Sequence, residues 1–171
     1  MNSFMDLAKE RYSVRAFKSD PVEDEKIALI LDAAGIAPTA RNRQPQKIYV
    51  VRNEENLKKL AELSPCTYNA PVVFMIGYDM NTVSVAVKEG TTFGEQDASI
   101  VCTHMMLEAQ ELGLGTCWVG YFHPDKTREA FGLPESVRLV ALLPTGYPAE
   151  NAEPSPKHTT FRAQDEMIEY L

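Results

Sequence analysis

The stretch Pro71-Val72-Val73-Phe74-Met75-Ile76-Gly77-Tyr78 is a short, continuous apolar run that is rich in β-forming residues. A strand covered on both faces has such a run, whereas a strand with one face in water alternates apolar and polar residues. The stretch therefore predicts a buried strand at the centre of a sheet. Other short runs predict further strands over residues 49–51, 116–121 and 137–143.

Between these strands, apolar residues recur at helical spacing. The pattern predicts a short helix after Ser3, a second over 23–35, a third capped by Asn53 with Leu57, Leu60 and Ala61 facing inward, and two more over 95–112 and 124–131. The 95–112 helix is apolar almost all round, which predicts a central helix that is also shared with a partner subunit. Helices and strands intermix without the regular alternation of a doubly wound sheet, so the predicted fold class is α+β.

Composition narrows the class of protein. The 171 residues suit a single domain over 1–171, and 44% hydrophobic with 24% charged residues is ordinary globular usage. A formal net charge of −7 argues against a general nucleic-acid binder. No apolar run is long enough for a membrane span and no export signal is recognisable, so we expect a cytoplasmic protein without a membrane partner. Three widely spaced cysteines fit neither a disulfide framework nor a zinc site, and we expect them to be reduced and structural.

The segment Arg11-Tyr12-Ser13-Val14-Arg15 follows the first predicted helix and carries two guanidinium groups and a hydroxyl. In an extended segment, residues 11, 13 and 15 point the same way, so their side chains can converge on one ligand. Arginine stays charged at any working pH and can bind two phosphate oxygens at once. The segment therefore indicates a site for a phosphate dianion, although Arg-x-Ser-x-Arg alone is also typical of a solvated basic turn.

Three later features accompany this segment in order along the chain. Ala37 to Pro45 follows a predicted helix and precedes a predicted strand, Gly113 to Gly120 follows the long helix, and Arg162 lies near the end. Together with Arg11 to Arg15, they resemble the FMN-dependent nitroreductase family over nearly the whole chain. The resemblance implies an α+β fold with helices flanking a central, mostly antiparallel sheet. It also implies an intertwined homodimer with FMN at the interface and a C-terminal arm, residues 151–171, that extends to the partner subunit.

The resemblance also assigns residues to FMN in three groups. The candidates for the phosphate and ribityl chain are Arg11, Tyr12 (through its backbone), Ser13, Arg15 and Arg162. The candidates that the partner subunit supplies to the flavin, or that bond its polar edges, are Pro38, Thr39, Ala40, Asn42 and Gln44. The candidates along the reactive edge of the ring are Trp118, Val119 and Gly120. A glycine in this last group lets the backbone approach a flat ring closely.

The substrate face departs from the family pattern. Arg41 stands where many relatives have glycine, and Gln46 where many have tryptophan. Arg41 and Arg43 either attract an anionic substrate or the nicotinamide phosphate, or are exposed loop charges. The candidates for the N1/O2 edge of the flavin are Lys88, Arg41 and Arg43, and we assign no general acid or base.

Other chemistries fit the sequence less well. Cys102 and His104 lie two residues apart, so on a helix they point to different sides and cannot form a nucleophile-base pair. The three histidines are scattered without partners at metal-ligand spacing, which predicts no metal site. Gly113-Leu114-Gly115 lacks the third glycine and the following helix of a dinucleotide fingerprint, so it is interpreted as a helix stop.

The resemblance implies an NAD(P)H-dependent oxidoreductase. NAD(P)H would give a hydride to flavin N5 and leave, and an electron-poor small molecule such as a nitroaromatic or a quinone would then enter the same space, which is a ping-pong mechanism. Two alternatives use the same cofactor site. One is a flavin or enoate-type reductase, and the other is a protein that binds FMN for storage or sensing without turnover.

Overall fold

The computed structural model describes residues 3–85 and 90–171. Its centre is a four-stranded sheet in the order β1-β2-β4-β3, with every neighbouring pair antiparallel. The strands are β1 (Gln46–Val51), β2 (Val72–Asp79), β3 (Gly115–Thr116) and β4 (Val137–Gly146). The apolar run quoted above forms β2, which is paired on both sides and buried along all but its last residue. Both the central strand and the α+β class are confirmed.

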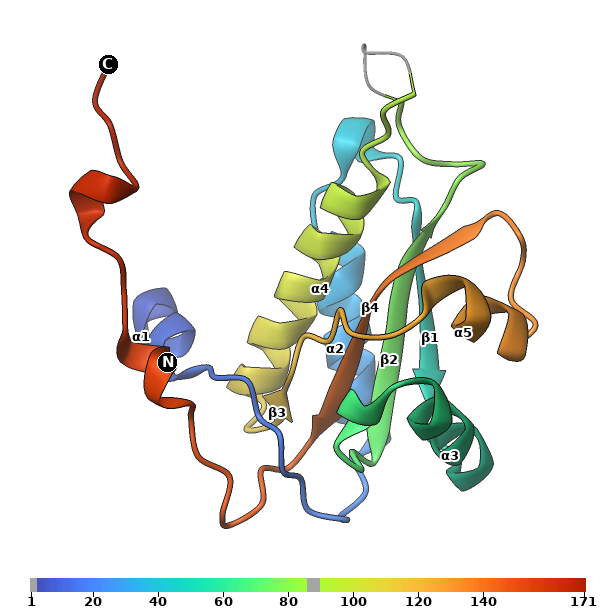
Figure 1. Cartoon of the computed structure of the whole chain (residues 1–171), viewed down its shortest axis with the longest axis horizontal. Helices are drawn as coiled ribbons and strands as arrows, with labels where there is room; N and C mark the ends of the chain where they lie inside the picture. Colours follow the sequence, from blue (N-terminus) through green and yellow to red (C-terminus); the bar gives the residue numbers. More distant parts are fainter. Residues whose placement is uncertain (1–2, 86–89) are drawn as a thin grey trace.

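Helices cover both faces of the sheet (Figure 1). They are α1 (Phe4–Glu10), α2 (Asp24–Ile36), α3 (Glu54–Leu63), α4 (Gly94–Glu111) and α5 (Pro124–Ala130). The helices α2 and α4 pack together on one face, and α3 and α5 lie on the other. None of the helices within the described residues is long and apolar enough to cross a bilayer.

Successive residues of β2 contribute to two separate cores, because side chains alternate across a strand. Phe74 and Ile76 join the core under α2 and α4. Val73 and Met75 join the core on the opposite face, together with Leu60 of α3. All four β2 side chains are at most 1% exposed, and a fully buried side chain of this size stabilises the fold by about 1.5–3 kcal/mol. The sheet is therefore a rigid base for whatever lies along its edges.

The helix α4 has the central position that its sequence predicted. Its inward residues are fully buried in the first core: Ala98, Val101, Cys102, Met105 and Ala109. On the other side, the side chain of Ile100 is 38% exposed. The described residues thus leave the part of α4 around Ile100 uncovered. On the buried side, burial raises the pKa of the Cys102 thiol well above its ordinary value, as expected of a structural cysteine.

Two helix starts were predicted by their caps. The Ser3 hydroxyl accepts a hydrogen bond from the Asp6 amide at 3.2 Å, and the Asp6 carboxyl accepts one from the Ser3 amide at 3.1 Å. At α3, the Asn53 side chain accepts a hydrogen bond from the Asn56 amide at 2.8 Å. The expected inward position of Ala61 is wrong, since this residue is exposed. It shares a helix face with the half-buried Leu57 at the border of the contact, whereas Leu60 points to its centre.

The strand expected over 116–121 is wrong beyond its first residue, because β3 ends at Thr116. The Cys117 amide donates to the Pro144 carbonyl at 3.2 Å, but Pro144 has no N–H with which to return the bond. A reciprocal pair forms again only between Val119 and Leu142, at 2.9 and 3.0 Å. Residues 117–120 therefore follow the edge of β4 as an irregular segment.

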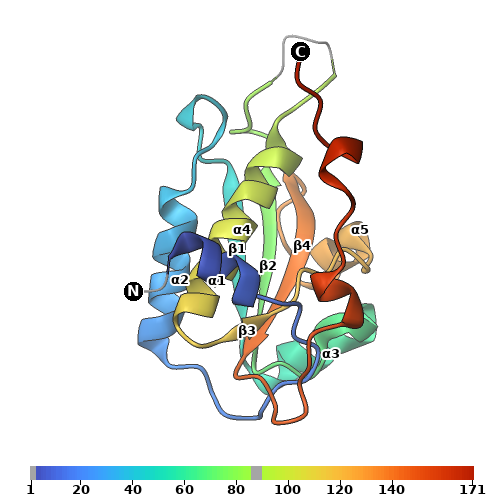
Figure 2. The same ribbon diagram turned by 90° about the vertical axis from the view of Figure 1, so that its left-hand side faces the viewer.

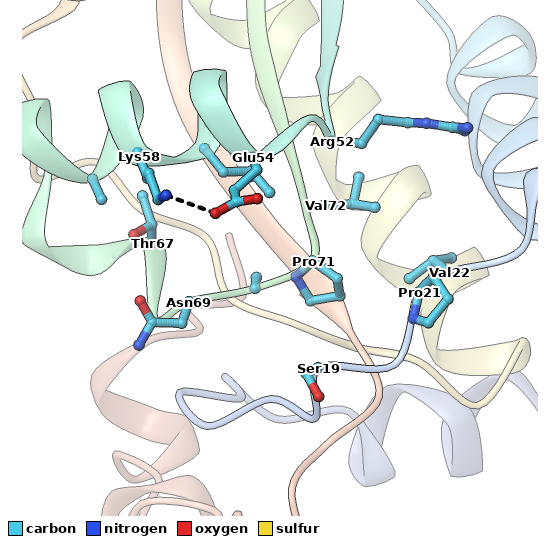
Figure 3. A pocket seen from close by; sticks show the side chains of 13 residues that line it. Ser19, Pro21, Val22, Arg52, Glu54, Lys58, Thr67, Asn69, Pro71 and Val72 are labelled. Carbon is cyan, nitrogen blue, oxygen red and sulfur yellow. Dashed lines mark hydrogen bonds and ion pairs between the residues drawn. The ribbon is translucent and has the colours of Figure 1, made fainter.

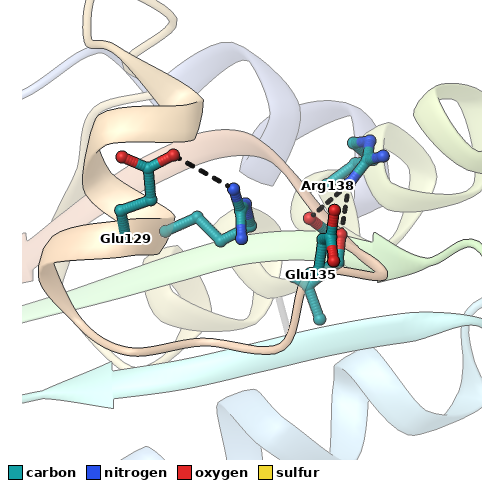
Figure 4. A network of polar contacts seen from close by, with 5 residues as sticks. Glu129, Glu135 and Arg138 are labelled. Carbon is teal, nitrogen blue, oxygen red and sulfur yellow. Dashed lines mark hydrogen bonds and ion pairs between the residues drawn. The ribbon is translucent and has the colours of Figure 1, made fainter.

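Arg138 holds the turn that leads into β4 (Figure 4). Arg138 Nη1 donates to the backbone oxygens of Glu135 at 2.6 Å and Val137 at 3.2 Å. Beside it, the β2–β4 register shifts at Gly77, where an added Cβ would lie 2.2 Å from the Arg138 carbonyl oxygen. The backbone of β4 thus occupies the space that a side chain at position 77 would need.

Residues 13–18 and the residues that follow β4 meet at the β3 edge of the sheet. Ser13 pairs in parallel with Thr116, the Lys18 amide donates to Tyr147 at 2.9 Å, and the Ala149 amide donates to Ala16 at 3.0 Å. Beyond this point the C-terminal arm leaves the sheet and carries only two short 3-10 turns, at Pro156–Thr159 and Gln164–Glu166. Residues 159–171 are exposed throughout. Figure 2 views the side on which α1, α2, α4 and this arm lie.

Candidate cofactor site

Arg11, Ser13 and Arg15, called here the basic cluster, occupy an extended segment beside β3. The parallel pairing of Ser13 with Thr116 and the 2.9 Å bond from the Val14 amide to the Thr116 carbonyl hold the backbone there. Val14 is 1% exposed and packs where a Cβ on Gly115 would be only 2.5 Å away. Because Val14 points inward, its neighbours Ser13 and Arg15 point away from the core.

The basic cluster lies near the thiol of Cys117. Burial raises the pKa of that thiol, and three groups lower it in part: the Arg15 guanidinium, a hydrogen bond with Ser13, and the Arg11 guanidinium. Groups that act on one sulfur atom in this way lie close to one another, since the effect of a charge on a pKa decays over a few ångströms. All three polar side chains of the cluster therefore lie near the Cys117 sulfur.

Tyr68 also contacts the basic cluster. Burial raises the pKa of its phenol, and so does a hydrogen bond with Cys66, whereas a hydrogen bond with Arg15 lowers it. Tyr68 and the following Asn69 have left-handed backbone angles, with φ of 53° and 54°. Such conformations are costly for residues other than glycine and concentrate at functional sites. Tyr68 and Cys117 were not recognised from the sequence, because each joins the cluster only through tertiary packing.

The other two candidates for the phosphate group lie near the C-terminal arm. The Tyr12 hydroxyl donates to the Ala152 carbonyl at 3.2 Å, and its ring meets the edge of His158 with centroids 6.3 Å apart. Tyr12 therefore anchors the start of the arm beside the basic cluster. Arg162 lies further along, where its Nε donates to Glu166 at 3.1 Å in an exposed ion pair.

The loop over residues 38–44 contains the second group of candidates. Its Asn42 amide donates to the Thr39 carbonyl at 2.9 Å, and its Gln44 amide to the Thr39 hydroxyl at 3.0 Å. The Ala40 amide donates to the carboxyl group of Asp97, in the first turn of α4, at 2.8 Å. The loop thus lies at the beginning of α4, whereas the basic cluster lies beyond its end.

These two groups of candidates are far apart within one chain. The helix between them has 18 residues, which corresponds to about 27 Å. Figure 1 shows the 38–44 loop and the β3 edge at opposite ends of α4. One protomer therefore does not bring both groups to a single ligand.

The third group of candidates runs along the edge of β4. Trp118 packs against the first core and Val119 is buried in the second. Gly120 is exposed, and a Cβ placed on it would meet no atom within 4 Å. Nothing within the described chain requires a glycine at this position, and the space in front of its backbone is open. Lys88, one candidate for the flavin N1/O2 edge, lies outside the described residues.

A pocket of about 470 Å³ lies elsewhere, between the Ser19–Val22 segment, α3 and the start of β2 (Figure 3). Its two cationic side chains already have acidic partners, because Lys58 Nζ contacts Glu54 at 2.6 Å and Arg52 pairs with Asp24. The lining contains no candidate from the three groups above. This pocket therefore does not coincide with the candidate cofactor residues, which lie in the basic cluster, in the 38–44 loop and along the 118–120 edge.

Comparison with known proteins agrees with this architecture. The sequence profile of the nitroreductase family matches residues 8–67 and 62–147. The crystal structure of a nitroreductase family protein from Clostridium difficile 630 has a TM-score of 0.92 at 40% identity and covers 99% of this chain and 98% of that one. An FMN-dependent nitroreductase from Clostridium difficile R20291 has a TM-score of 0.79 at 26% identity, with 98% of both chains covered. The FMN reductase (NAD(P)H) of Bacillus subtilis strain 168 is 26% identical, covering 100% of this chain and 79% of that protein. Because the profile spans most of the chain and the fold is shared from end to end, this protein belongs to the nitroreductase family.

Proposed function

We propose that this protein is an FMN-dependent oxidoreductase that transfers reducing equivalents from NAD(P)H to an electron-poor organic acceptor, such as a nitroaromatic or a quinone, by a ping-pong mechanism. The observation that carries the proposal is the extended Arg11–Arg15 segment, which is held beside β3 at Thr116 with Val14 buried and Ser13 and Arg15 facing away from the core. Family membership supports it, as do two similar proteins, an FMN reductase and an FMN-dependent nitroreductase.

The residues present fit FMN in two respects. Charged donors suit a phosphate dianion, and the guanidinium groups of Arg11 and Arg15 both lie near the Cys117 thiol. A flat ring needs backbone that it can approach, and Gly120 leaves free the space that a Cβ would fill. Bound FMN would supply a two-electron centre that accepts a hydride at N5 and returns it to an acceptor.

The side chains of this protein would position the cofactor rather than exchange protons with the substrate. Arg11, Ser13 and Arg15 would hold the phosphate and ribityl chain, with Tyr12 fixing the segment against the arm. The backbone of 118–120 would lie along the ring edge, with Trp118 and Val119 anchored in the two cores. We assign no general acid or base, because water can supply the protons.

We also propose that the protein works as an intertwined homodimer of single-domain chains over 1–171. The 38–44 loop of each protomer would complete the site that the partner's basic cluster begins, since about 27 Å of helix separates the two within one chain. Exposed apolar side chains mark the face that a second copy would cover: Phe4, Met5, Leu29, Ile36 and Ile100. The arm carries more of them, namely Phe161, Met167, Ile168, Tyr170 and Leu171. Exposed apolar groups this numerous are typical of a protein interface.

Reduction of the bound cofactor tests the activity. Protein loaded with FMN and mixed with NADH or NADPH in a stopped-flow instrument should lose its visible flavin absorbance, and a nitroaromatic or quinone should restore it. Full bleaching without reoxidation by either class would indicate a different acceptor, with free flavins and enoates tested next. Failure of both donors to bleach the flavin would contradict the proposed enzyme and favour a storage or sensing protein.

Removal of the end of the arm tests the dimer. A chain ending at Thr159 lacks the exposed residues 160–171. Its dimer dissociation constant should be about tenfold larger than that of the full chain, because the apolar side chains of the arm are gone. Analytical ultracentrifugation measures both dissociation constants. Asp165→Ala, an exposed polar position on the same arm, is the control and should leave the dimer unchanged. A full-length protein that stays monomeric at high concentration would overturn the dimer.

A further inference from the structure

Asp97 is a buried acidic residue that none of the roles above uses. It lies in the first turn of α4 and is 2% exposed. Its Oδ1 accepts the 2.8 Å hydrogen bond from the Ala40 amide. Its Oδ2 is buried and has no hydrogen-bond partner among the described residues. Only one carboxyl oxygen of Asp97 therefore accepts a hydrogen bond from a described residue, and that bond holds the 38–44 loop.

The loop that Asp97 holds has an unusual backbone. Arg41, Asn42 and Gln44 have φ values of 55°, 51° and 48°, so three residues other than glycine are left-handed within four positions. Each such residue costs on the order of 1 kcal/mol, and the conformation persists only where surrounding contacts hold it. All three residues are exposed, so packing of their side chains supplies little of that constraint.

Stability of the single chain does not account for a carboxyl group at this position. A buried polar atom without a partner is unfavourable, and a single hydrogen bond adds only about 0.5–1.5 kcal/mol of net stability. Asp97 also lies one turn before Val101, on the side of α4 that packs into the first core. An apolar side chain would therefore suit the helix at least as well.

We infer that Asp97 is a positioning residue, whose carboxyl group fixes the strained 38–44 loop through the Ala40 amide and so shapes the part of the flavin site that each protomer offers to its partner. The inference rests on the proposed function, because it concerns the same FMN site. Asp97 acts through the loop backbone and does not touch the cofactor.

Three variants separate positioning from folding. In Asp97→Leu the acceptor is lost while the branch at Cγ is kept, so the unfolding temperature of the apoprotein should fall by no more than a few degrees and the dissociation constant for FMN should rise by about tenfold or more. In Asp97→Asn the amide oxygen can still accept the Ala40 N–H, so FMN affinity should stay within about threefold of wild type. Glu95→Leu is the matched control, because it removes an exposed acid from the same helical turn and should change neither quantity.

The visible circular dichroism of bound FMN gives a second readout, because it reports the asymmetry of the ring environment. It should change in Asp97→Leu saturated with FMN and be restored in Asp97→Asn. The inference is overturned if Asp97→Leu binds FMN as the wild type does with an unchanged spectrum, if Asp97→Asn loses as much affinity as Asp97→Leu, or if Asp97→Leu does not fold. Failure of the proposed function is distinct, because the wild-type protein itself would then not bind FMN or not be reduced.

Discussion

Replacing Arg11 and Arg15 together by alanine should raise the dissociation constant for FMN by about 10²–10⁴-fold, because two charge-assisted hydrogen bonds worth about 1.5–3 kcal/mol each are lost. Titration of the apoprotein with FMN, followed by flavin fluorescence, measures the change. The fold should be little affected, since Arg11 is half-buried, Arg15 is exposed, and the contacts of Arg15 are the backbone oxygen of Ser13, at 3.1 Å, and the Tyr68 hydroxyl.

A control variant should have the same net charge, because loss of two cations also weakens general attraction for an anion. Arg52→Ala with Lys58→Ala removes two cations near the 470 Å³ pocket, away from the basic cluster. This control should change FMN affinity by no more than about threefold, as expected for screened surface charges. Full flavin occupancy in the Arg11 and Arg15 double variant would contradict the site assignment.

Gly77→Ala should lower the free energy of unfolding of the apoprotein by about 2–4 kcal/mol. The added Cβ would lie 2.2 Å from the Arg138 carbonyl oxygen and 2.9 Å from the Leu139 Cα, both backbone atoms of β4. A strand cannot turn away as a flexible side chain can, so β2 and β4 must separate at the register shift. Urea unfolding followed by circular dichroism measures the loss.

Gly35→Ala makes the same chemical change at a position in α2 where no atom lies within 4 Å. Alanine is a better helix former than glycine by about 0.5–1 kcal/mol, so this variant should be slightly more stable than the wild type. The two substitutions should therefore shift the unfolding midpoint in opposite directions. A Gly77→Ala protein as stable as the wild type would show that the close approach of β2 and β4 is not required.

Local patterns in the sequence predicted the elements well where the deciding interaction is itself local. The apolar run of β2 and the caps at Ser3 and Asn53 each depend on residues within a few positions. The length of β3 depends instead on Pro144, which lies 28 residues after Thr116 and meets Cys117 only in the folded sheet. Periodicity alone carries no information about which strand will lie opposite, so the expected strand over 116–121 was too long.

The candidate site likewise contains residues that a local sequence pattern predicted and residues that only tertiary packing brings in. The spacing of Arg11, Ser13 and Arg15 is a local signal, whereas Tyr68 and Cys117 reach the basic cluster from other elements. Asp97 did carry a signal, since an acid one turn before Val101 lies on the apolar side of a buried helix. Its contact with Ala40 spans 57 positions and could not be predicted from either segment alone.

The pairing of residues 13–18 with the β3 edge and with residues after β4 also has a consequence for biosynthesis. The ribosome synthesises this segment well before its hydrogen-bonding partners at Thr116, Tyr147 and Ala149. The segment therefore cannot form this pairing until β4 and the residues after it have been synthesised. Capture of the coenzyme should accordingly follow the synthesis of β4 rather than guide the folding of earlier segments.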